Sequence, residues 1–226
     1  MAGELYIVST PIGNLDDISK RAISTLNSVD VILCEDTRVT KKILNQFQIK
    51  KKLFVYNDFN EYRKAQGILD LIINGSNIAL VTDAGTPCIS DPGYRLVNLA
   101  QKNNIKVITI PGACSVTSAL SICGLPTDTF FFQGFLPKKK GRHSKFLELA
   151  DFKCSIVLFE SPKRVIKTLN DIEKYFGDRY IAICRELTKI YEQVISDKIS
   201  NILLNKDDIK LKGEFIIIIA KEGYEN

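Results

Sequence analysis

The sequence predicts an α/β protein of two domains: an N-terminal parallel sheet with helices on both faces, and a C-terminal mixed sheet with helices. Through the first half of the chain, short apolar runs of strand length alternate with segments of helical periodicity. The closing strands are instead joined by short links, which favour antiparallel pairing. Polar and charged motifs follow the strands throughout, as expected where the strand ends of such a sheet build a site.

The N-terminal half alternates strand and helix without interruption. Leu5–Val8 is the first apolar run, Asp16 and Asp17 suit the first turn of the helix after it, and Asn74-Gly75 is a typical helix stop. The expected strands cover residues 5–8, 29–34, 50–56, 78–81 and 105–110, and the expected helices cover 15–26, 39–47, 62–73 and 94–103. Short links between these elements predict the parallel sheet.

A domain boundary is expected where the fifth strand ends. Pro111-Gly112 stops that strand, and a helix of small residues opens at Ser115. We therefore expect domains at residues 1–112 and 113–226. Further strands are expected over 130–133, 155–159, 180–184, 190–195 and 215–220, with helices over 145–150, 165–175 and 199–205.

The composition is ordinary for a globular protein, with 45% hydrophobic and 25% charged residues among 226. The net charge of +5 permits a polyanionic partner without requiring one. No apolar run approaches the ~20 residues of a membrane span, and the N-terminus lacks the pattern of a signal peptide. Six scattered cysteines without a Cys-x-x-Cys pair, and a single histidine, argue against a zinc site. We therefore expect reduced thiols, no metal and a cytoplasmic protein.

The stretch from Val81 to Tyr94 is the strongest candidate for a binding loop. It follows an apolar strand and holds two carboxylates, Asp83 and Asp91, among glycines and prolines that make tight turns. In a parallel sheet, the loops after the strand carboxyl ends hold the ligand. An ordinary strand-to-helix link needs only a few residues, so we favour a binding crevice at this edge.

Two other loops of the first half follow strands. Ser9–Asn14 joins a strand to a helix but lacks the Gly-x-Gly-x-x-Gly pattern, so it does not indicate dinucleotide binding by itself. Glu35–Arg38 is either a helix start with acids at its N-terminus or a functional polar cluster.

Two segments of the second half also leave two interpretations open. The small residues of Ser115–Ser118 either admit a ligand or pack a helix tightly. The basic turn at 138–145 is either a solvated face or a phosphate-binding surface, with Phe135 available to stack on a base.

The motifs occur almost in the order of a known family. They are Thr10-Pro-Ile-Gly-Asn-Leu, Glu35-Asp-Thr-Arg, Asp83-Ala-Gly-Thr-Pro-Cys-Ile-Ser-Asp-Pro-Gly, Pro111-Gly-Ala, Gly124-Leu-Pro-Thr-Asp, Gly134-Phe-Leu-Pro, Arg185-Glu-Leu-Thr-Lys and Gly213-Glu. Over residues 4–220 the chain resembles the small-subunit ribosomal RNA (cytidine-2′-O)-methyltransferase family, within the tetrapyrrole methylase superfamily. The long motif at 83–93 carries most of this specificity.

The resemblance implies a two-domain tetrapyrrole-methylase-like fold with S-adenosyl-L-methionine in the cleft between the domains. It also implies a homodimer that acts on RNA of the small ribosomal subunit. Matched position by position, it implies cofactor contacts at Pro11, Gly13, Asp83, Ala84, Gly85, Ile89, Asp91, Thr117, Ser118, Leu158, Phe159, Cys184 and Gly213. Phe59 and Lys163 stand where the family usually has histidine, so neither position supplies a histidine base.

The implied chemistry needs a proton acceptor, because a ribose hydroxyl must lose its proton as it attacks the methyl group. Cations beside the phosphates are also expected. The candidate catalytic residues are Glu35, Asp36, Arg38, Glu160 and Arg185. The candidate RNA contacts are Lys138, Lys139, Lys140, Arg142, Lys163 and Arg164. Salt bridges that tie the domains together are the alternative role for these charges.

Two other functions fit part of the sequence. A tetrapyrrole (precorrin-type) methyltransferase would share the fold and cofactor, but a flat macrocycle favours a wide apolar cleft over a basic turn. A non-catalytic RNA-binding protein would have no need of the Asp83–Gly93 loop. We therefore expect an RNA methyltransferase.

Overall fold

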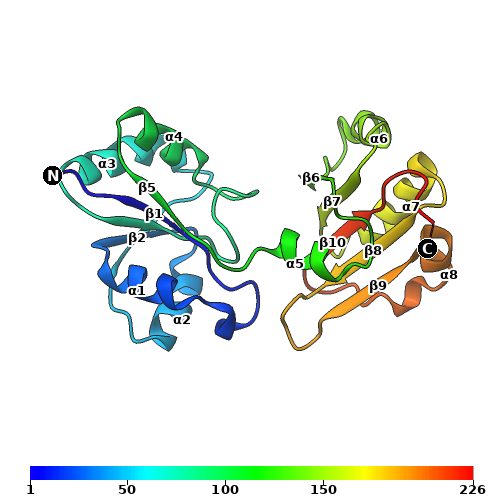
Figure 1. Cartoon of the computed structure of the whole chain (residues 1–226), viewed down its shortest axis with the longest axis horizontal. Coiled ribbons are helices and arrows are strands. Elements are labelled where there is room, and N and C mark those ends of the chain that lie inside the picture. The colour runs from blue at the N-terminus through cyan, green and yellow to red at the C-terminus, as the bar shows by residue number, and fades with distance from the viewer. Residues whose placement is uncertain (226) are drawn as a thin grey trace. The chain divides into compact units, whose positions relative to one another are not determined.

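A computed structural model describes residues 1–225. The chain divides into two compact units, Met1–Cys114 and the part from Ser115 onward, each with its own five-stranded sheet and hydrophobic core (Figure 1). One sheet is parallel and the other mixed, which confirms the expected fold class. Among the described residues, no helix combines the length and apolar character needed to cross a bilayer.

The first unit is built on the parallel sheet. Its strands are β1 (Leu5–Val8), β2 (Val31–Cys34), β3 (Lys52–Val55), β4 (Ile78–Leu80) and β5 (Val107–Ile110). They lie in the order β3-β2-β4-β1-β5, and each neighbouring pair is parallel. Every residue of β2 and β4 is buried, because helices cover both faces of the sheet and leave no face for polar side chains.

Two pairs of helices cover the two faces of this sheet, with α1 and α2 on one side and α3 and α4 on the other (Figure 1). The helices are α1 (Lys20–Ser28), α2 (Thr37–Gln46), α3 (Glu61–Ile73) and α4 (Tyr94–Lys102), with a short 3-10 turn, η1 (Leu15–Asp17), before α1. Each side has its own core. Leu26 and Leu44 belong to the core under α1 and α2, and Leu69 and Leu96 to the core under α3 and α4.

The strands β1 and β4 are neighbours in this sheet, but the connections that follow them lead to opposite faces. The chain runs from β1 to α1 and from β4 to α4, and these helices cover different faces (Figure 1). In parallel α/β sheets such a point opens a crevice at the carboxyl ends of the two strands. The loops 9–14 and 81–93 therefore lie where this class of sheet binds its ligand.

The second unit carries the mixed sheet. Its strands are β6 (Phe130–Phe135), β7 (Ser155–Glu160), β8 (Tyr180–Arg185), β9 (Gln193–Lys198) and β10 (Phe215–Ile219). They lie in the order β6-β7-β10-β8-β9; β6 and β7 are parallel and the other pairs antiparallel. The helices are α5 (Ser115–Ile122), α6 (Arg142–Ala150), α7 (Val165–Phe176) and α8 (Ile199–Leu204), followed by the 3-10 turn η2 (Lys206–Asp208).

The core of the second unit lies between one face of its sheet and the helices α6, α7 and α8. Phe146, Leu169 and Ile202 from these helices pack with Leu158 and Ile217 from the sheet. The short helix α5 packs against the central strand β10. This core holds the ends of β7 and β8, where several candidate residues lie.

The first helix begins later than expected. The pattern over 15–26 predicted one helix, but α1 starts at Lys20, because the Ser19 hydroxyl accepts a hydrogen bond from Ala22 N (3.0 Å) and caps the helix there. The preceding residues form η1 instead. Ser19 lies inside an apolar helical pattern, and a serine in such a position does not by itself predict the start of a helix.

The strand expected over 190–195 lies at Gln193–Lys198. The residues before it form the loop between β8 and β9, in which Glu186 (φ 50°) and Thr188 (φ 65°) adopt left-handed backbone. Since neither residue is glycine, the sequence carried no sign of this turn.

Candidate functional site

The loops after β1 and β4 are joined by backbone hydrogen bonds at the point where the connections diverge. Thr10 N donates to Gly85 O (2.8 Å), and Gly85 N donates to Thr10 O (3.1 Å). The Thr10 hydroxyl also donates to Thr82 O (3.0 Å). This bridge fixes the start of the Asp83–Gly93 loop against the loop that contains Pro11 and Gly13.

The end of β5 is tied to the same place. The hydroxyl oxygens of Ser9 and Thr86 are 2.9 Å apart, and the Thr86 hydroxyl donates to Ala113 O (3.1 Å). A Cβ on Gly112 would lie 2.9 Å from Ser9 Cβ, so the chain passes here only as glycine. Loops from the three neighbouring strands β4, β1 and β5 thus meet at one edge of the sheet. Ser9 and Thr86 are not among the site residues expected from the sequence, because a hydroxyl in a loop is too common a feature to indicate a site.

The Asp83–Gly93 loop adopts backbone conformations that few side chains tolerate. Its residues with positive φ are Gly85 (88°), Cys88 (71°), Ser90 (62°) and Gly93 (134°). A Cβ on Gly93 would lie 2.6 Å from both Cys88 Sγ and Leu80 Cδ2. Strained backbone of this kind clusters at ligand-binding loops. Ala84 and Ile89 are exposed on the loop, and Asp83 and Asp91 are half-buried.

Four carboxylates, those of Glu35, Asp36, Asp83 and Asp91, gather at the carboxyl ends of β2 and β4. Glu35 Oε1 accepts hydrogen bonds from the Thr82 hydroxyl and from Asp83 N (3.3 Å). Asp83 Oδ1 in turn accepts a hydrogen bond from Asp36 N (3.1 Å). The structure therefore brings two of the expected catalytic residues together with the expected cofactor loop.

Two of these carboxylates, Asp83 and Asp91, have raised pKa values. Burial raises the pKa of Asp83, and the charge of Glu35 adds to the shift. Burial likewise raises the pKa of Asp91 to about 6, again with a contribution from Glu35. Because these anions are held close together and partly out of water, the cluster favours a cationic ligand, which would relieve their mutual repulsion.

Asp36 and Arg38 form an ion pair at the start of α2. Asp36 Oδ1 accepts hydrogen bonds from Arg38 N (2.8 Å) and Arg38 Nε (3.0 Å). Hydrogen bonds from Arg38 lower the pKa of Asp36 to about 2. For Asp36 the structure supports the helix-start interpretation, whereas the Glu35 side chain turns toward the Asp83–Gly93 loop.

The far end of the Asp83–Gly93 loop is held by a residue that the sequence analysis did not include in the site. Glu61, in the first turn of α3, is buried, and its Oε1 accepts hydrogen bonds from Gly93 N (3.2 Å) and Arg95 N (3.0 Å). Glu61 thus caps the N-terminus of α4, where Gly93 has no side chain to do so. A cap supplied by another helix leaves no local pattern in the sequence.

In the second unit, the expected cofactor residues lie at strand ends and in α5. Phe159 of β7 and Cys184 of β8 pair with the same residue of β10, so they share one row of the sheet. Leu158 is fully buried in the core, in a strand that is paired on both sides. Thr117 and Ser118 lie in the first turn of α5. Burial raises the pKa of Cys184 to about 12, which keeps this thiol protonated.

Arg185 holds the backbone of two loops. Its guanidinium Nε donates to Lys212 O (2.6 Å) and Nη1 donates to Tyr191 O (3.0 Å), and the residue is buried. Next to Lys212, Gly213 has a φ of 91°, and a Cβ there would run into the Glu186 side chain. The geometry therefore favours a structural role for Arg185, and the expected catalytic role stays a prediction.

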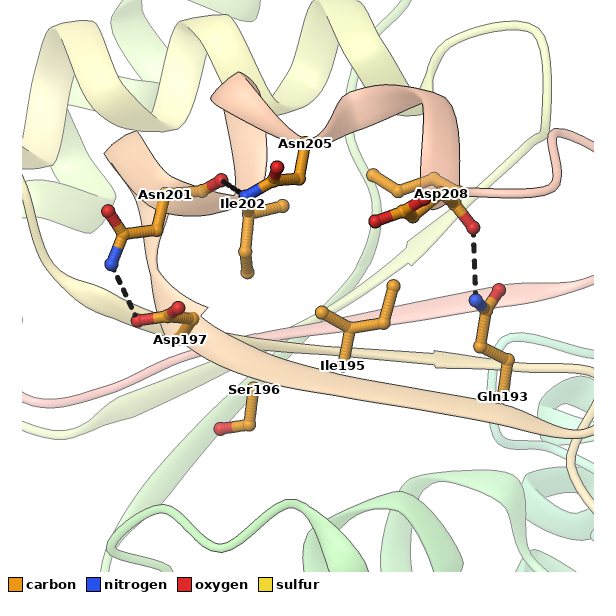
Figure 2. A pocket seen from close by; sticks show the side chains of 9 residues that line it. Gln193, Ile195, Ser196, Asp197, Asn201, Ile202, Asn205 and Asp208 are labelled. Atoms are coloured by element: carbon orange, nitrogen blue, oxygen red, sulfur yellow. Dashed lines mark hydrogen bonds between the residues drawn. The ribbon is translucent and has the colours of Figure 1, made fainter.

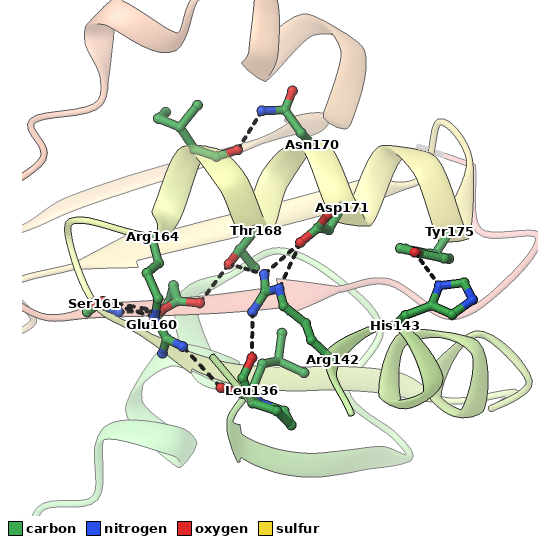
Figure 3. A network of polar contacts seen from close by, with 12 residues as sticks. Leu136, Arg142, His143, Glu160, Ser161, Arg164, Thr168, Asn170, Asp171 and Tyr175 are labelled. Atoms are coloured by element: carbon green, nitrogen blue, oxygen red, sulfur yellow. Dashed lines mark hydrogen bonds and ion pairs between the residues drawn. The ribbon is translucent and has the colours of Figure 1, made fainter. Parts of the chain in front are cut away.

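Glu160 lies in a buried polar network (Figure 3). Its Oε1 accepts a hydrogen bond from Ser161 N (2.6 Å) and is 2.8 Å from Arg164 Nε, while its Oε2 accepts from the Thr168 hydroxyl (2.6 Å). The side chain is 0% exposed. Because both carboxylate oxygens are occupied away from solvent, the geometry favours a structural role for Glu160, and the expected role as base or orienting group stays a prediction.

The expected RNA contacts separate into two groups. Lys138, Lys139, Lys140 and Lys163 are exposed. Arg142 and Arg164, by contrast, belong to the network around Glu160, and the Arg142 side chain is only 7% exposed. A guanidinium held inside the protein offers little surface to phosphates, so the geometry favours a structural role for these two arginines, and their contact with RNA stays a prediction. His143, which the sequence places in the same basic turn, contacts the Tyr175 hydroxyl (Figure 3).

A pocket at the edge of the second unit lies apart from these residues. It is formed between β9 and the α8–η2 segment (Figure 2) and is lined by Gln193, Ile195, Ser196, Asp197, Asn201, Ile202, Asn205, Asp208 and Ile209. Its polar groups bond one another: Gln193 Nε2 donates to Asp208 O (3.1 Å), and Asn201 Nδ2 donates to Asp197 Oδ1 (3.1 Å). None of the expected site residues lines it, so we do not include it in the candidate site. Among residues 1–225, no cluster of three or more histidine, cysteine or acidic side chains is suited to a metal ion.

Known proteins resemble this chain over nearly its whole length. The family model for tetrapyrrole (corrin/porphyrin) methylases matches residues 4–203. Solved structures with the same fold include cobalt precorrin-4 methyltransferase (TM-score 0.70, 18% identity, 96% of this chain and 94% of that one). Another is diphthine synthase (TM-score 0.75, 14% identity, 96% and 90%). The chain belongs to the tetrapyrrole methylase family.

Closer relatives define a narrower group. The ribosomal RNA small subunit methyltransferase I of Vibrio cholerae is 45% identical over 226 residues, covering 98% of this chain and 78% of that protein. The protein of the same name from Thermotoga maritima is 43% identical over 218 residues, covering 96% and 98%. At this similarity, the chain belongs to the ribosomal RNA small subunit methyltransferase I family.

Membership of this family makes the chain a methyltransferase and confirms the expected cofactor, S-adenosyl-L-methionine. A uroporphyrin-III C-methyltransferase of the same fold from Thermus thermophilus was solved with S-adenyl homocysteine, the product that remains after methyl transfer (TM-score 0.67, 14% identity, 96% of this chain and 97% of that one).

Proposed function

We propose that the protein transfers a methyl group from S-adenosyl-L-methionine to the 2′-hydroxyl of a cytidine ribose in small-subunit ribosomal RNA. The observation that carries this proposal is the Asp83–Gly93 loop, fastened at its start to Thr10 and at its end to Glu61, beside a cluster of carboxylates. Relatives named for methylation of small-subunit ribosomal RNA support the choice of acceptor.

The first unit fits the charge of the methyl donor. S-adenosyl-L-methionine carries a positive sulfonium and supplies an activated methyl group when it is bound. Burial is the main cause of the raised pKa values of Asp83 and Asp91, and the charge of Glu35 adds to both shifts, so a cation bound here would be stabilised. We infer that Asp83, Ala84, Gly85, Ile89 and Asp91 hold the donor together with the Pro11–Gly13 loop. The other expected cofactor contacts stay predictions; they are Thr117, Ser118, Leu158, Phe159, Cys184 and Gly213.

Among the expected catalytic carboxylates, Glu35 suits proton transfer best. Asp36 is held ionised by Arg38, and Glu160 is buried within a closed network. Glu35 is only half-buried, and its hydrogen bonds to Thr82 and Asp83 N all use Oε1. We infer that Glu35 Oε2 accepts the proton of the ribose hydroxyl or orients that hydroxyl for attack.

The exposed lysines suit a polyanionic acceptor. Lys138, Lys139 and Lys140 protrude into solvent, and within residues 1–225 none of them forms an ion pair. Their charges are therefore available to RNA phosphates, and Lys163 adds another exposed cation. A tetrapyrrole carries acidic side chains too, but its macrocycle would gain little from three adjacent lysines on a turn.

Incubation of the purified protein with labelled S-adenosyl-L-methionine and one of three acceptors tests the proposal. The acceptors are small ribosomal subunits, protein-free ribosomal RNA and uroporphyrinogen. We expect label on a cytidine 2′-oxygen of subunit RNA, located by nuclease digestion and mass spectrometry. Label on the macrocycle alone would establish the tetrapyrrole alternative, and a protein that binds RNA but not the methyl donor would be a non-catalytic RNA-binding module.

Glu35→Gln separates chemistry from binding in the same assay. Loss of a positioned general base costs about 10²–10⁴ in kcat, while the affinity for S-adenosyl-L-methionine, measured by calorimetry, should change little. The matched control is Glu148→Gln, which alters an exposed carboxylate of α6 paired only with Lys145. Full activity of Glu35→Gln would exclude Glu35 as the base.

We also propose that the protein is a homodimer that works in the cytoplasm, where small ribosomal subunits are found. Both statements rest on the resemblance of the chain to its family. Light scattering on the purified full-length protein checks the first, since a single mass near 25.4 kDa would indicate a monomer.

A further inference from the structure

The buried network in Figure 3 ends on the turn that carries the exposed lysines. Arg164 Nη1 donates to Leu136 O (3.1 Å), and Arg142 Nη1 donates to Pro137 O (3.3 Å). These two carbonyl groups are consecutive and directly precede Lys138. Two largely buried guanidinium groups therefore hold the backbone on the N-terminal side of the lysine turn.

The other side of the turn is fixed by the start of α6. Arg142 N donates to Lys139 O (3.2 Å), and Lys145 N donates to Gly141 O (3.0 Å). Gly141 has a left-handed backbone (φ 80°), which lets the chain reverse into the helix. Leu136 is buried in the core of the second unit. The backbone of the turn is thus anchored at both ends while its lysine side chains remain in solvent.

Thr168 joins the two halves of the network. Its hydroxyl donates to Glu160 Oε2 (2.6 Å) and accepts a hydrogen bond from Arg142 Nη2 (2.8 Å), and the residue is fully buried. Asp171 Oδ2 completes the chain by accepting from Arg142 Nε (2.9 Å). Two carboxylates thereby balance two guanidinium groups, so that no charge is left buried without a partner.

We propose that this network is a positioning device for RNA binding: it fixes the lysine turn so that the Lys138–Lys140 ammonium groups meet RNA phosphates in a set geometry. The inference rests on the proposed function. Buried ion pairs contribute little net stability compared with apolar packing, whereas two of the donors here end on carbonyls of a surface turn. A turn that is already ordered loses less conformational freedom when RNA binds. Glu160, Arg142, Arg164 and Thr168 act through the lysines and do not touch the RNA.

A pair of substitutions at Thr168 tests the proposal. Thr168→Val removes the hydroxyl that links Glu160 to Arg142 and keeps the side-chain shape, while Thr168→Ser keeps the hydroxyl and serves as the matched control. For Thr168→Val we expect the KM for small subunits to rise about tenfold, the order of the cost of ordering a few side chains. The kcat and the affinity for S-adenosyl-L-methionine should stay within about twofold. The salt dependence of RNA binding should keep its slope, because the lysine charges remain.

Trypsin cleavage provides a readout that does not involve RNA. The native full-length variants are digested briefly, and cleavage after Lys138, Lys139 and Lys140 is followed by mass spectrometry. Cleavage requires local opening of the backbone, so we expect Thr168→Val to be cut here about tenfold faster than the wild-type protein, and Thr168→Ser at the wild-type rate.

The outcomes separate this inference from the proposed function. If wild-type protein methylates no small subunits, the proposed function fails, and the cleavage rates alone decide whether the network fixes the turn. If Thr168→Val changes neither KM nor cleavage, or damages kcat and donor affinity as strongly as KM, the positioning role is overturned. Should thermal melting show that Thr168→Val does not fold, Asp171→Asn replaces it, because Asp171 lies at the edge of the network with its side chain 24% exposed.

Discussion

Asp83 is the first residue of the strained Asp83–Gly93 loop. It accepts a hydrogen bond from Asp36 N, and burial raises its pKa. We expect Asp83→Ala to weaken S-adenosyl-L-methionine binding by at least about tenfold, since one charge-assisted contact contributes roughly 1.5–3 kcal/mol. The melting temperature should change by only a few degrees.

Isothermal calorimetry on the variant checks this expectation. Asp70→Ala is the matched control, because Asp70 is an exposed aspartate of the same unit whose partner, Gln66, lies on its own helix. Unchanged donor affinity in Asp83→Ala would remove Asp83 from the binding site.

Asp91 predicts a pH dependence of stability. Burial raises its pKa from 3.8 to about 6 in the folded protein. Between these values the folded state binds more protons than the unfolded state, so this group makes the protein less stable as the pH rises through the window. Asp91→Asn should therefore melt a few degrees above the wild-type protein at neutral pH and at the same temperature near the lower end of the window. Equal melting temperatures at both ends would contradict the assigned burial of Asp91.

Residue roles were the least predictable level from the sequence. Glu35 and Glu160 both follow a predicted apolar strand. Glu35 bonds Thr82 and Asp83, which lie far along the chain, and it stays half-buried. Glu160 is enclosed by Arg164 and Thr168 of the following segment, only four and eight residues away. Periodicity places a residue on an element, but it does not reveal which side chains meet it.

At the scale of elements, α3 and α4 are linked by Glu61, which caps α4 and holds the end of the Asp83–Gly93 loop. Losing a cap typically costs about 1–2 kcal/mol. We expect Glu61→Ala to lower the free energy of unfolding by about this amount, measured in urea, and to weaken donor binding. Glu61→Gln keeps an oxygen acceptor and should lose less than half as much. Equal losses in both variants would show that the charge of Glu61, and not its acceptor oxygen, stabilises α4.

Most elements were predictable because their strands are short apolar runs between clear turn residues. The strand Leu5–Val8 lies where the sequence predicted it, and most other boundaries differ by one to three residues. The larger differences at 15–26 and 190–195 have local causes, a serine cap and a loop with left-handed residues that are not glycine. Both are conformations that side chains only weakly encode.

At the scale of the whole molecule, RNA could be attracted either by the total net charge of +5 or by the lysines of one turn, Lys138–Lys140. We expect Lys138, Lys139 and Lys140 changed together to Gln to lower the slope of log affinity against log salt by about 2, following ~0.7 per lost phosphate contact on single-stranded RNA. Arg142 is left unchanged because it is buried in the network.

The chain offers a control with the same change in charge. Lys50, Lys51 and Lys52 changed to Gln also remove three positive charges, but they lie at the start of β3 in the first unit. If this control lowers the salt slope as much as the first variant, total charge and not the turn would govern RNA binding. Filter binding over a range of salt concentrations measures both slopes.

The division into two α/β units follows from the pattern of apolar runs, since parallel crossovers need intervening helices and antiparallel returns do not. The domain boundary expected from the sequence lies between residues 112 and 113, and the chain divides into its two compact units between Cys114 and Ser115. The mixed order β6-β7-β10-β8-β9 was not predictable in detail, because the last strand inserts between earlier ones through contacts that no short motif encodes.

The pairing of Thr10 with Gly85 uses main-chain atoms on both sides. Mutation replaces side chains and leaves amide and carbonyl groups in place. These two backbone hydrogen bonds therefore tolerate substitution at either residue as long as the backbone conformation is kept. A scaffold held in this way can diverge freely around its donor site. Such freedom fits the solved structures that share this fold at 14–18% identity to this chain, among them a cobalt precorrin-4 methyltransferase and a diphthine synthase.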